Sequence, residues 1–188
     1  NNPSPLVIVV PGFQRSKETL SNIAIELSRR GIVTISIDPY AQGLSSSSFS
    51  TRAATKEGYG MFSLVDYVYD TSILNYIDKD KIGVTGHSAG GLAAIRSAQH
   101  FGKIARKKNT KSKVHSVFVS GMLRMGFKEE DLKKIRSNVG VSYALYDEGA
   151  WQNELKNGNL ENAPEILRLI NLQTVSYTHL RAHETFHD

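Results

Sequence analysis

The sequence predicts an α/β fold, built on a mostly parallel sheet with helices on both faces. Short apolar runs rich in β-branched residues recur along the chain, and such runs are typical of strands that are buried on both faces. Amphipathic stretches of helical period separate these runs. Strands that alternate with helices in this way indicate parallel pairing through right-handed crossovers.

Apolar runs predict the strands. Each run is short, and each is followed by a residue or dipeptide that favours a turn or a helix start. Pro11-Gly12 ends the first run, Asp38-Pro39 ends the second, and Gly86 ends the third. In chain order, the expected strands cover residues 6–10, 32–37, 82–85, 114–119 and 139–146.

The stretches between and after these runs predict the helices. The first has an apolar face at helical spacing, and Gly31 follows it where a C-terminal cap belongs. The second carries Val65, Tyr69 and Ile73 on one face, and the third is rich in small residues. In chain order, the expected helices cover residues 17–30, 60–77, 89–106, 128–137 and 163–171.

Composition places the chain among globular proteins of one domain. Of its 188 residues, 40% are hydrophobic and 22% are charged, which excludes disordered, collagen-like and coiled-coil proteins. No run of about 18 apolar residues exists, so we expect no membrane span. Without cysteine there is no thiolate metal site or disulfide, and we expect no cofactor. Because a lack of cysteine suits reducing and oxidising compartments alike, localisation stays open, with the cytoplasm favoured.

The net charge of +5 is concentrated in one segment that contains no acidic residue. A basic segment suits nucleic-acid binding, but no aromatic residues interleave with these charges as a stacking platform would need. We therefore interpret the segment as the solvated end of a helix and the loop after it, and we expect no nucleic-acid partner. Its cations are Lys103, Arg106, Lys107, Lys108, Lys111 and Lys113.

The two ends of the chain do not fit a complete domain. Residue 1 is not an initiator Met, and residues 175–185 resemble the conceptual translation of a transposase-type sequencing adapter. Segments of that kind are left out of fold reasoning. We therefore expect a partial domain over residues 1–173, incomplete at both ends, and a non-native tail over residues 174–188.

The tail contains a formal H-E-x-x-H, the signature of zinc-protease helices. His183, Glu184 and His187 form the motif, and His179 lies four residues before it. Histidines at this spacing share one helix face and can bind zinc there. Because no third ligand follows and the segment is expected to be non-native, we predict no metal site.

The most informative segment is the G-x-S-x-G of Gly86-His87-Ser88-Ala89-Gly90, between a predicted strand and a predicted helix. A nucleophilic serine in this setting sits on a sharp turn that projects its hydroxyl. A side chain at either glycine would clash with the neighbouring strand or helix, and the helix N-terminus offers free N–H groups to an oxyanion. The alternative is a plain turn in which Ser88 caps the helix. We favour the nucleophile.

A second segment, Pro11-Gly12-Phe13, follows the first strand. An oxyanion hole needs two backbone N–H groups that point at one position. We expect Ala89, just after the nucleophile, to supply one of them and Phe13 to supply the other. The alternative is an ordinary Pro-Gly turn.

With these two segments the chain resembles the α/β-hydrolase fold family, and more closely its small esterase and dienelactone-hydrolase-like members. The D-x-x-x-x-G-x-S of residues 38–45 also matches a turn that is common in this family. The resemblance covers about residues 5–150. It implies that Asp38, Gly43 and Ser45 are structural residues that pin a loop at the edge of the sheet.

The resemblance also implies an acid after the nucleophile, and a histidine after the acid. The strand over 139–146 ends in Asp147 and Glu148; Asp147 is the better candidate, and a surface turn is the alternative. No histidine lies between His115 and the tail, and we interpret His87, His100 and His115 as packed or solvated side chains. The triad base is therefore expected to be missing from this chain.

Together these features predict a serine hydrolase of carboxylic esters or related acyl bonds, acting on a small-molecule acyl substrate. Ser88 would be the nucleophile and Asp147 would orient the histidine. Without that base the chain is expected to be inactive or nearly so. The alternatives are a non-catalytic binding protein, an acyltransferase or a peptidase on the same fold. A small lid is predicted between residues 119 and 139, or else simple packing of that segment on the sheet; its apolar residues are Met122, Leu123, Met125 and Phe127.

Overall fold

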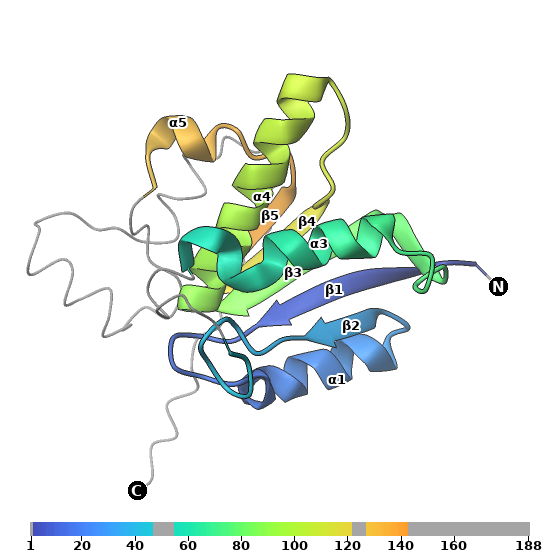
Figure 1. The fold of residues 1–188 in the computed structure, drawn as a ribbon, viewed down its shortest axis with the longest axis vertical. Helices are drawn as coiled ribbons and strands as arrows, with labels where there is room; N and C mark the ends of the chain where they lie inside the picture. The colour runs from blue at the N-terminus through green and yellow to red at the C-terminus, as the bar shows by residue number, and fades with distance from the viewer. Residues whose placement is uncertain (1, 47–54, 122–126, 143–188) are drawn as a thin grey trace, which may run out of the picture.

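A computed structural model describes residues 2–46, 55–121 and 127–142 of the chain. At its centre is a five-stranded sheet with the strand order β2-β1-β3-β4-β5, in which every neighbouring pair is parallel (Figure 1). The predicted parallel sheet is therefore confirmed. Its strands are β1 (Ser4–Val10), β2 (Val33–Ser36), β3 (Ile77–His87), β4 (Ser116–Ser120) and β5 (Asn138–Ser142).

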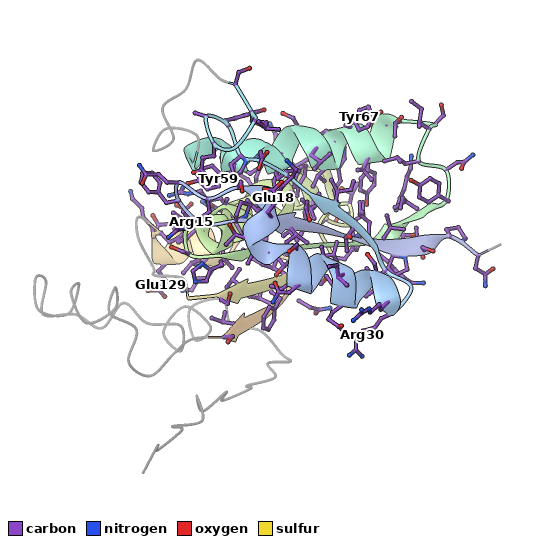
Figure 2. The ribbon with its side chains drawn as sticks, turned by 90° about the horizontal axis from the view of Figure 1, so that it is seen from below. Arg15, Glu18, Arg30, Tyr59, Tyr67 and Glu129 are labelled. Carbon is purple, nitrogen blue, oxygen red and sulfur yellow. The ribbon has the colours of Figure 1, made fainter. Side chains whose placement is uncertain are left out.

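Helices cover both faces of this sheet, as the sequence predicts. Helices α3 and α4 lie on one face, and α1 lies on the other face beside β2 (Figures 1 and 2). The single helix predicted over 17–30 is, in the structure, a 3-10 turn followed by an α-helix. The helical elements are η1 (Lys17–Leu20), α1 (Ser21–Arg29), η2 (Thr55–Gly60), α3 (Met61–Asp70), α4 (Ala89–Lys108) and α5 (Glu129–Leu132).

The strand register places one apolar row across the sheet beneath α4. Ile8, Val84, Val117 and Val139 are successive register partners, and none is more than 3% exposed. Because side chains alternate between the faces of a strand, this face carries the core. Helix α4 meets it with small buried residues such as Ala94, which let the helix approach the strands closely.

The predicted helix over 60–77 is wrong at its C-terminal end. Helix α3 ends at Asp70, and Thr71 adopts an extended conformation with ψ of 144°. The Thr71 hydroxyl accepts the N–H of Ile73, a local hydrogen bond that competes with the helix. Ile73 is consequently 73% exposed, and Ile77 pairs with Ser4, so that β3 begins earlier than predicted.

The polar helix predicted over 128–137 is also wrong, because α5 is a single turn that ends at Leu132. The chain then runs against α4, where a Cβ placed on Gly102 would lie 2.3 Å from the carbonyl oxygen of Lys134. The Ser137 hydroxyl donates to the carbonyl of Val114 at 2.7 Å and leads the chain into β5. Tertiary packing therefore ends this helix. The predicted strand residues 143–146 and the helix over 163–171 lie outside the described residues.

Candidate active site

Ser88 lies on the turn between β3 and α4, at the carboxyl edge of the sheet. Its backbone has φ of 52° and ψ of −119°, a conformation that a residue other than glycine rarely adopts. The residue is exposed, and its side chain makes no capping hydrogen bond to the helix. Ser88 thus occupies the N-cap position of α4, but its side chain does not cap the helix.

The two glycines of the G-x-S-x-G make this turn sterically feasible. A Cβ on Gly86 would lie 2.4 Å from the backbone carbon of Gly90, and a Cβ on Gly90 would lie 2.2 Å from the carbonyl oxygen of Val10. Both distances are far below van der Waals contact. The start of α4 thus packs directly on the ends of β3 and β1, as the sequence analysis expected of these glycines.

The backbone of Ser88 is held from both sides. Its N–H donates to the carbonyl of Ser120 at the end of β4, at 3.0 Å, and its carbonyl accepts the N–H of Leu92 in α4, at 3.0 Å. These hydrogen bonds tie the strained residue to a strand and to a helix at once. The structure around Ser88 can therefore maintain a backbone conformation that the residue would not adopt alone.

The turn after β1 lies next to Ser88. A Cβ on Gly12 would be 3.4 Å from the Cβ of Ser88, and the N–H of Arg15 donates to the carbonyl of Gly12 at 3.2 Å. Phe13 is 45% exposed on this turn. Within the described residues, the N–H groups of Phe13 and Ala89 have no hydrogen-bond acceptor. Two predicted donors are thus available on the segments that flank Ser88.

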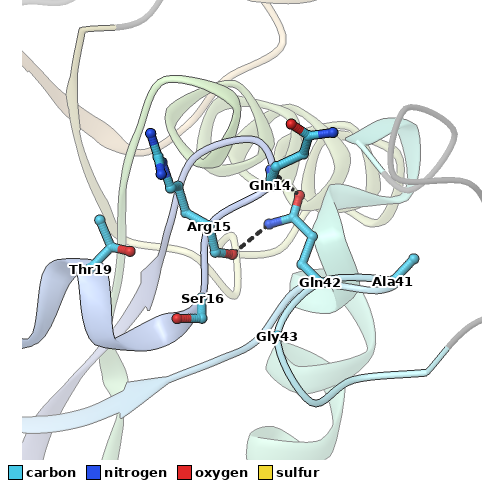
Figure 3. A pocket seen from close by; sticks show the side chains of 7 residues that line it. All are labelled: Gln14, Arg15, Ser16, Thr19, Ala41, Gln42 and Gly43. Atoms are coloured by element: carbon cyan, nitrogen blue, oxygen red, sulfur yellow. Dashed lines mark hydrogen bonds between the residues drawn. The ribbon is translucent and has the colours of Figure 1, made fainter.

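Gln42, in the segment after β2, clamps this turn (Figure 3). Its side-chain oxygen accepts the N–H of Gln14 at 2.9 Å, and its nitrogen donates to the carbonyls of Gly12 at 3.0 Å and Arg15 at 2.7 Å. Gln42 is only 5% exposed, and Gln14 has φ of 55°. The clamp therefore stabilises a turn that is itself strained. Nothing in the sequence distinguishes Gln42 from other loop amides, so sequence reasoning missed it.

The Gln42 clamp leads to a stability prediction. Gln42→Ala removes three hydrogen bonds to the backbone of the turn, which is expected to lower the free energy of unfolding by about 1–3 kcal/mol. Urea unfolding measures the loss, and faster hydrogen exchange at the Gln14 amide locates it. Gln14→Ala is the matched control, because the bond to Gln42 uses the backbone of Gln14. Equal stability of the two variants would contradict the clamp.

No family model matches the sequence, and no curated protein matches it. Alpha/beta hydrolase GrgF from Penicillium sp. sh18 matches 71% of this chain and 43% of its own length, with 17% identity and a TM-score of 0.53. DcsB, solved as a complex with its substrate analogue, matches 89% of this chain and 47% of its own length, with 19% identity and a TM-score of 0.52.

The chain has the α/β-hydrolase fold. At these identities the likeness concerns the fold, and the chain spans less than half the length of either neighbour. In this fold, Ser88 lies at the turn from the central strand β3 into α4.

Asp38 holds the loop after β2, as the sequence analysis expected. Its carboxylate accepts the backbone N–H of Lys17 at 2.7 Å and the N–H of Leu44 at 3.1 Å, and its carbonyl accepts the Ser45 hydroxyl at 2.8 Å. The side-chain ammonium of Lys17, at 2.8 Å, contributes most to holding the pKa of Asp38 below its ordinary value. A Cβ on Gly43 would touch the carboxylate. Each of these hydrogen bonds of Asp38 therefore holds the loop after β2 in place.

No hydrogen bond joins a described histidine to the hydroxyl of Ser88, which has no hydrogen-bond partner among the described residues. The ring of His100 stacks on Phe62, with centroids 4.3 Å apart. His115 lies beside Ile82, about 20 Å down β3 from Ser88 at the rise of a strand. His87 is exposed next to Ser88. The candidate acids Asp147 and Glu148, and the tail histidines, lie outside the described residues.

His115 supplies a pH-dependent test of the fold. Burial is the main cause that lowers its pKa below the ordinary 6.5, although Asp80 and Asp78 act in the opposite direction. The unfolded chain therefore takes up this proton first as the pH falls. Stability is expected to be complete above pH 6.5 and to decrease between 6.5 and the lower folded pKa. Urea unfolding across this range should show less pH dependence in His115→Gln; unchanged dependence would contradict the prediction.

The described residues contain no group of three His, Cys, Asp or Glu side chains placed to hold a metal ion. No helix in residues 2–46, 55–121 and 127–142 is long and apolar enough to cross a membrane. In the basic segment, Arg106, Lys107 and Lys108 form the last turn of α4 and are exposed, which agrees with a solvated helix end.

Of the predicted lid residues, only Phe127 lies in the described part. It is 6% exposed in the core, beneath the guanidinium of Arg96 at 5.0 Å from the ring centroid. Phe127 is therefore a core residue of the described part. Met122, Leu123 and Met125 lie outside the described residues.

Proposed function

We propose that the protein is a serine hydrolase of carboxylic esters or related acyl bonds, with Ser88 as its nucleophile. The observation that carries this proposal is the positive φ of an exposed serine between β3 and α4, held by hydrogen bonds on both sides. Such strain persists where the surrounding structure imposes it, and it clusters at active sites. A serine in an ordinary helix cap needs no such conformation.

In the proposed mechanism, the Ser88 hydroxyl attacks the substrate carbonyl and a histidine accepts its proton. The N–H groups of Phe13 and Ala89 stabilise the oxyanion of the tetrahedral intermediate. Asp147 holds the histidine in the required orientation. The acyl group is transferred to the Ser88 oxygen, the alcohol leaves with the proton, and water then hydrolyses the acyl-enzyme. No described histidine is hydrogen-bonded to Ser88, so we expect little turnover by this chain unaided.

Added imidazole tests the proposal by replacing the base. With p-nitrophenyl butyrate and imidazole, we expect one butyryl group on each folded chain. Mass spectrometry of the tryptic peptide over residues 82–96 locates it, because Ser88 is the only serine in that peptide. Absence of this adduct from folded protein would overturn the proposed nucleophile. Rapid turnover without imidazole would instead contradict the expectation that the base is missing.

A further inference from the structure

A polar cavity lies beside the turn that carries Phe13, between that turn and the segment after β2 (Figure 3). Its volume is about 610 Å³, within the range of small-molecule sites. It opens to solvent, and all of its lining belongs to the described residues. The lining consists of Gln14, Arg15, Ser16, Thr19, Ala41, Gln42 and Gly43.

Arg15 gives this cavity its charge. It is the only charged residue in the lining, and no carboxylate pairs with it among the described residues. The neighbouring cation Lys17 is already paired, with Asp38 at 2.8 Å and Glu18 at 3.3 Å. The cavity therefore presents one uncompensated positive charge among neutral amide and hydroxyl groups. That arrangement suits a ligand group with a single negative charge.

The cavity lies within reach of the candidate nucleophile. Gly12 abuts Ser88, and the hydrogen bond from the Arg15 N–H to the Gly12 carbonyl closes a four-residue turn. The end residues of such a turn have Cα atoms less than about 7 Å apart. The Gln42 clamp holds Arg15 at that position through its carbonyl. A short acyl chain on Ser88 can therefore extend to the cavity.

We propose that this cavity binds a carboxylate carried on the acyl chain of the substrate, with the Arg15 guanidinium as its main contact. This inference rests on the proposed function, because it identifies the substrate class of the same site. A guanidinium presents a planar fork of N–H donors that matches a carboxylate. The acyl half of the ester is the half that stays bonded to Ser88, so the carboxylate is assigned to that half.

Ligand binding tests the cavity without any chemistry at Ser88. Monomethyl succinate carries one carboxylate, and dimethyl succinate is its neutral counterpart. We expect only the former to bind when followed by NMR titration, and Arg15→Gln to weaken it about tenfold. The affinity of Arg15→Lys for monomethyl succinate should lie between those of the wild type and of Arg15→Gln. Lysine keeps the positive charge, but it lacks the planar fork of N–H donors. Arg30→Gln, with the same charge change at the far end of α1, is the control and should alter binding less than about twofold.

Acylation separates a failure of the cavity from a failure of the proposed function. With imidazole, we expect p-nitrophenyl hemisuccinate to acylate Ser88 faster than methyl p-nitrophenyl succinate, and Arg15→Gln to remove that preference. If both esters acylate Ser88 equally in the wild type, the nucleophile stands and the cavity proposal is overturned. Suppose that neither ester reacts, but monomethyl succinate still binds in a way that depends on Arg15. The carboxylate site then stands, and the proposed hydrolase function is overturned. Equal binding of the two succinates overturns the cavity proposal directly.

Discussion

Ser88→Ala is expected to abolish the imidazole-dependent acyl adduct, with a loss of at least about 100-fold in adduct yield. The substitution removes the only oxygen that the proposed mechanism acylates. It also removes no hydrogen bond of the fold, because the Ser88 bonds to Ser120 and Leu92 use backbone atoms. The variant should therefore unfold at nearly the same urea concentration as the wild type. Mass spectrometry of the peptide over residues 82–96, after a timed acid quench, measures the yield.

Ser120→Ala is the matched control for that loss. Ser120 ends β4 at the same edge of the sheet, and its hydrogen bond with Ser88 uses its backbone carbonyl. We expect the adduct on Ser88 to survive in this variant. An adduct that persists in Ser88→Ala, or that disappears in Ser120→Ala, would show that another group is the nucleophile.

Gly90→Ala is expected to destabilise the protein by about 3 kcal/mol, although alanine is the better helix former by about 1 kcal/mol. The added Cβ would lie 2.2 Å from the carbonyl oxygen of Val10 and 2.4 Å from that of Pro11. Neither partner is the end of a flexible side chain, so α4 must move away from β1. The same movement displaces the turn next to Ser88, and the acyl adduct should decrease with the stability.

Urea unfolding of Gly90→Ala measures this effect, and Gly12→Ala is the control. A Cβ on Gly12 would lie no closer than 3.4 Å to any neighbour, which is ordinary contact. Both variants add one methyl group to a glycine of the same site. Only Gly90→Ala forces two backbone segments apart. A Gly90→Ala protein as stable as Gly12→Ala would mean that the start of α4 does not pack on the end of β1 as described.

Much of the fold can be predicted from short-range patterns in the sequence. The runs that end at Pro11-Gly12 and Asp38-Pro39 form β1 and β2, and the small-residue stretch after the G-x-S-x-G forms α4. These predictions hold because hydrophobic period and turn residues act over a few positions. The adapter-like tail and the role of Asp147 stay predictions, since both lie outside the described residues.

The errors lie at helix ends, where a local hydrogen bond at Thr71 or a distant contact at Gly102 overrides the apolar period. The apolar period continues past Asp70, yet the chain leaves the helix there and Ile77 joins the sheet opposite Ser4. Likewise, the helix predicted over 128–137 stops at Leu132, and the following chain packs against Gly102. A pattern in one segment carries no information about the segment that will lie beside it. Such boundaries are decided by packing.

By itself, the sequence determined the alternating α/β pattern, the place of Ser88 between a strand and a helix, and the need for glycine on either side of it. Only the tertiary structure decided why those glycines are needed. The obstacle for Gly90 is the carbonyl of Val10, and the turn beside Ser88 is held by Gln42. These partners come from separate strands and loops, and their contacts exist only once the parallel sheet brings its carboxyl ends to one edge.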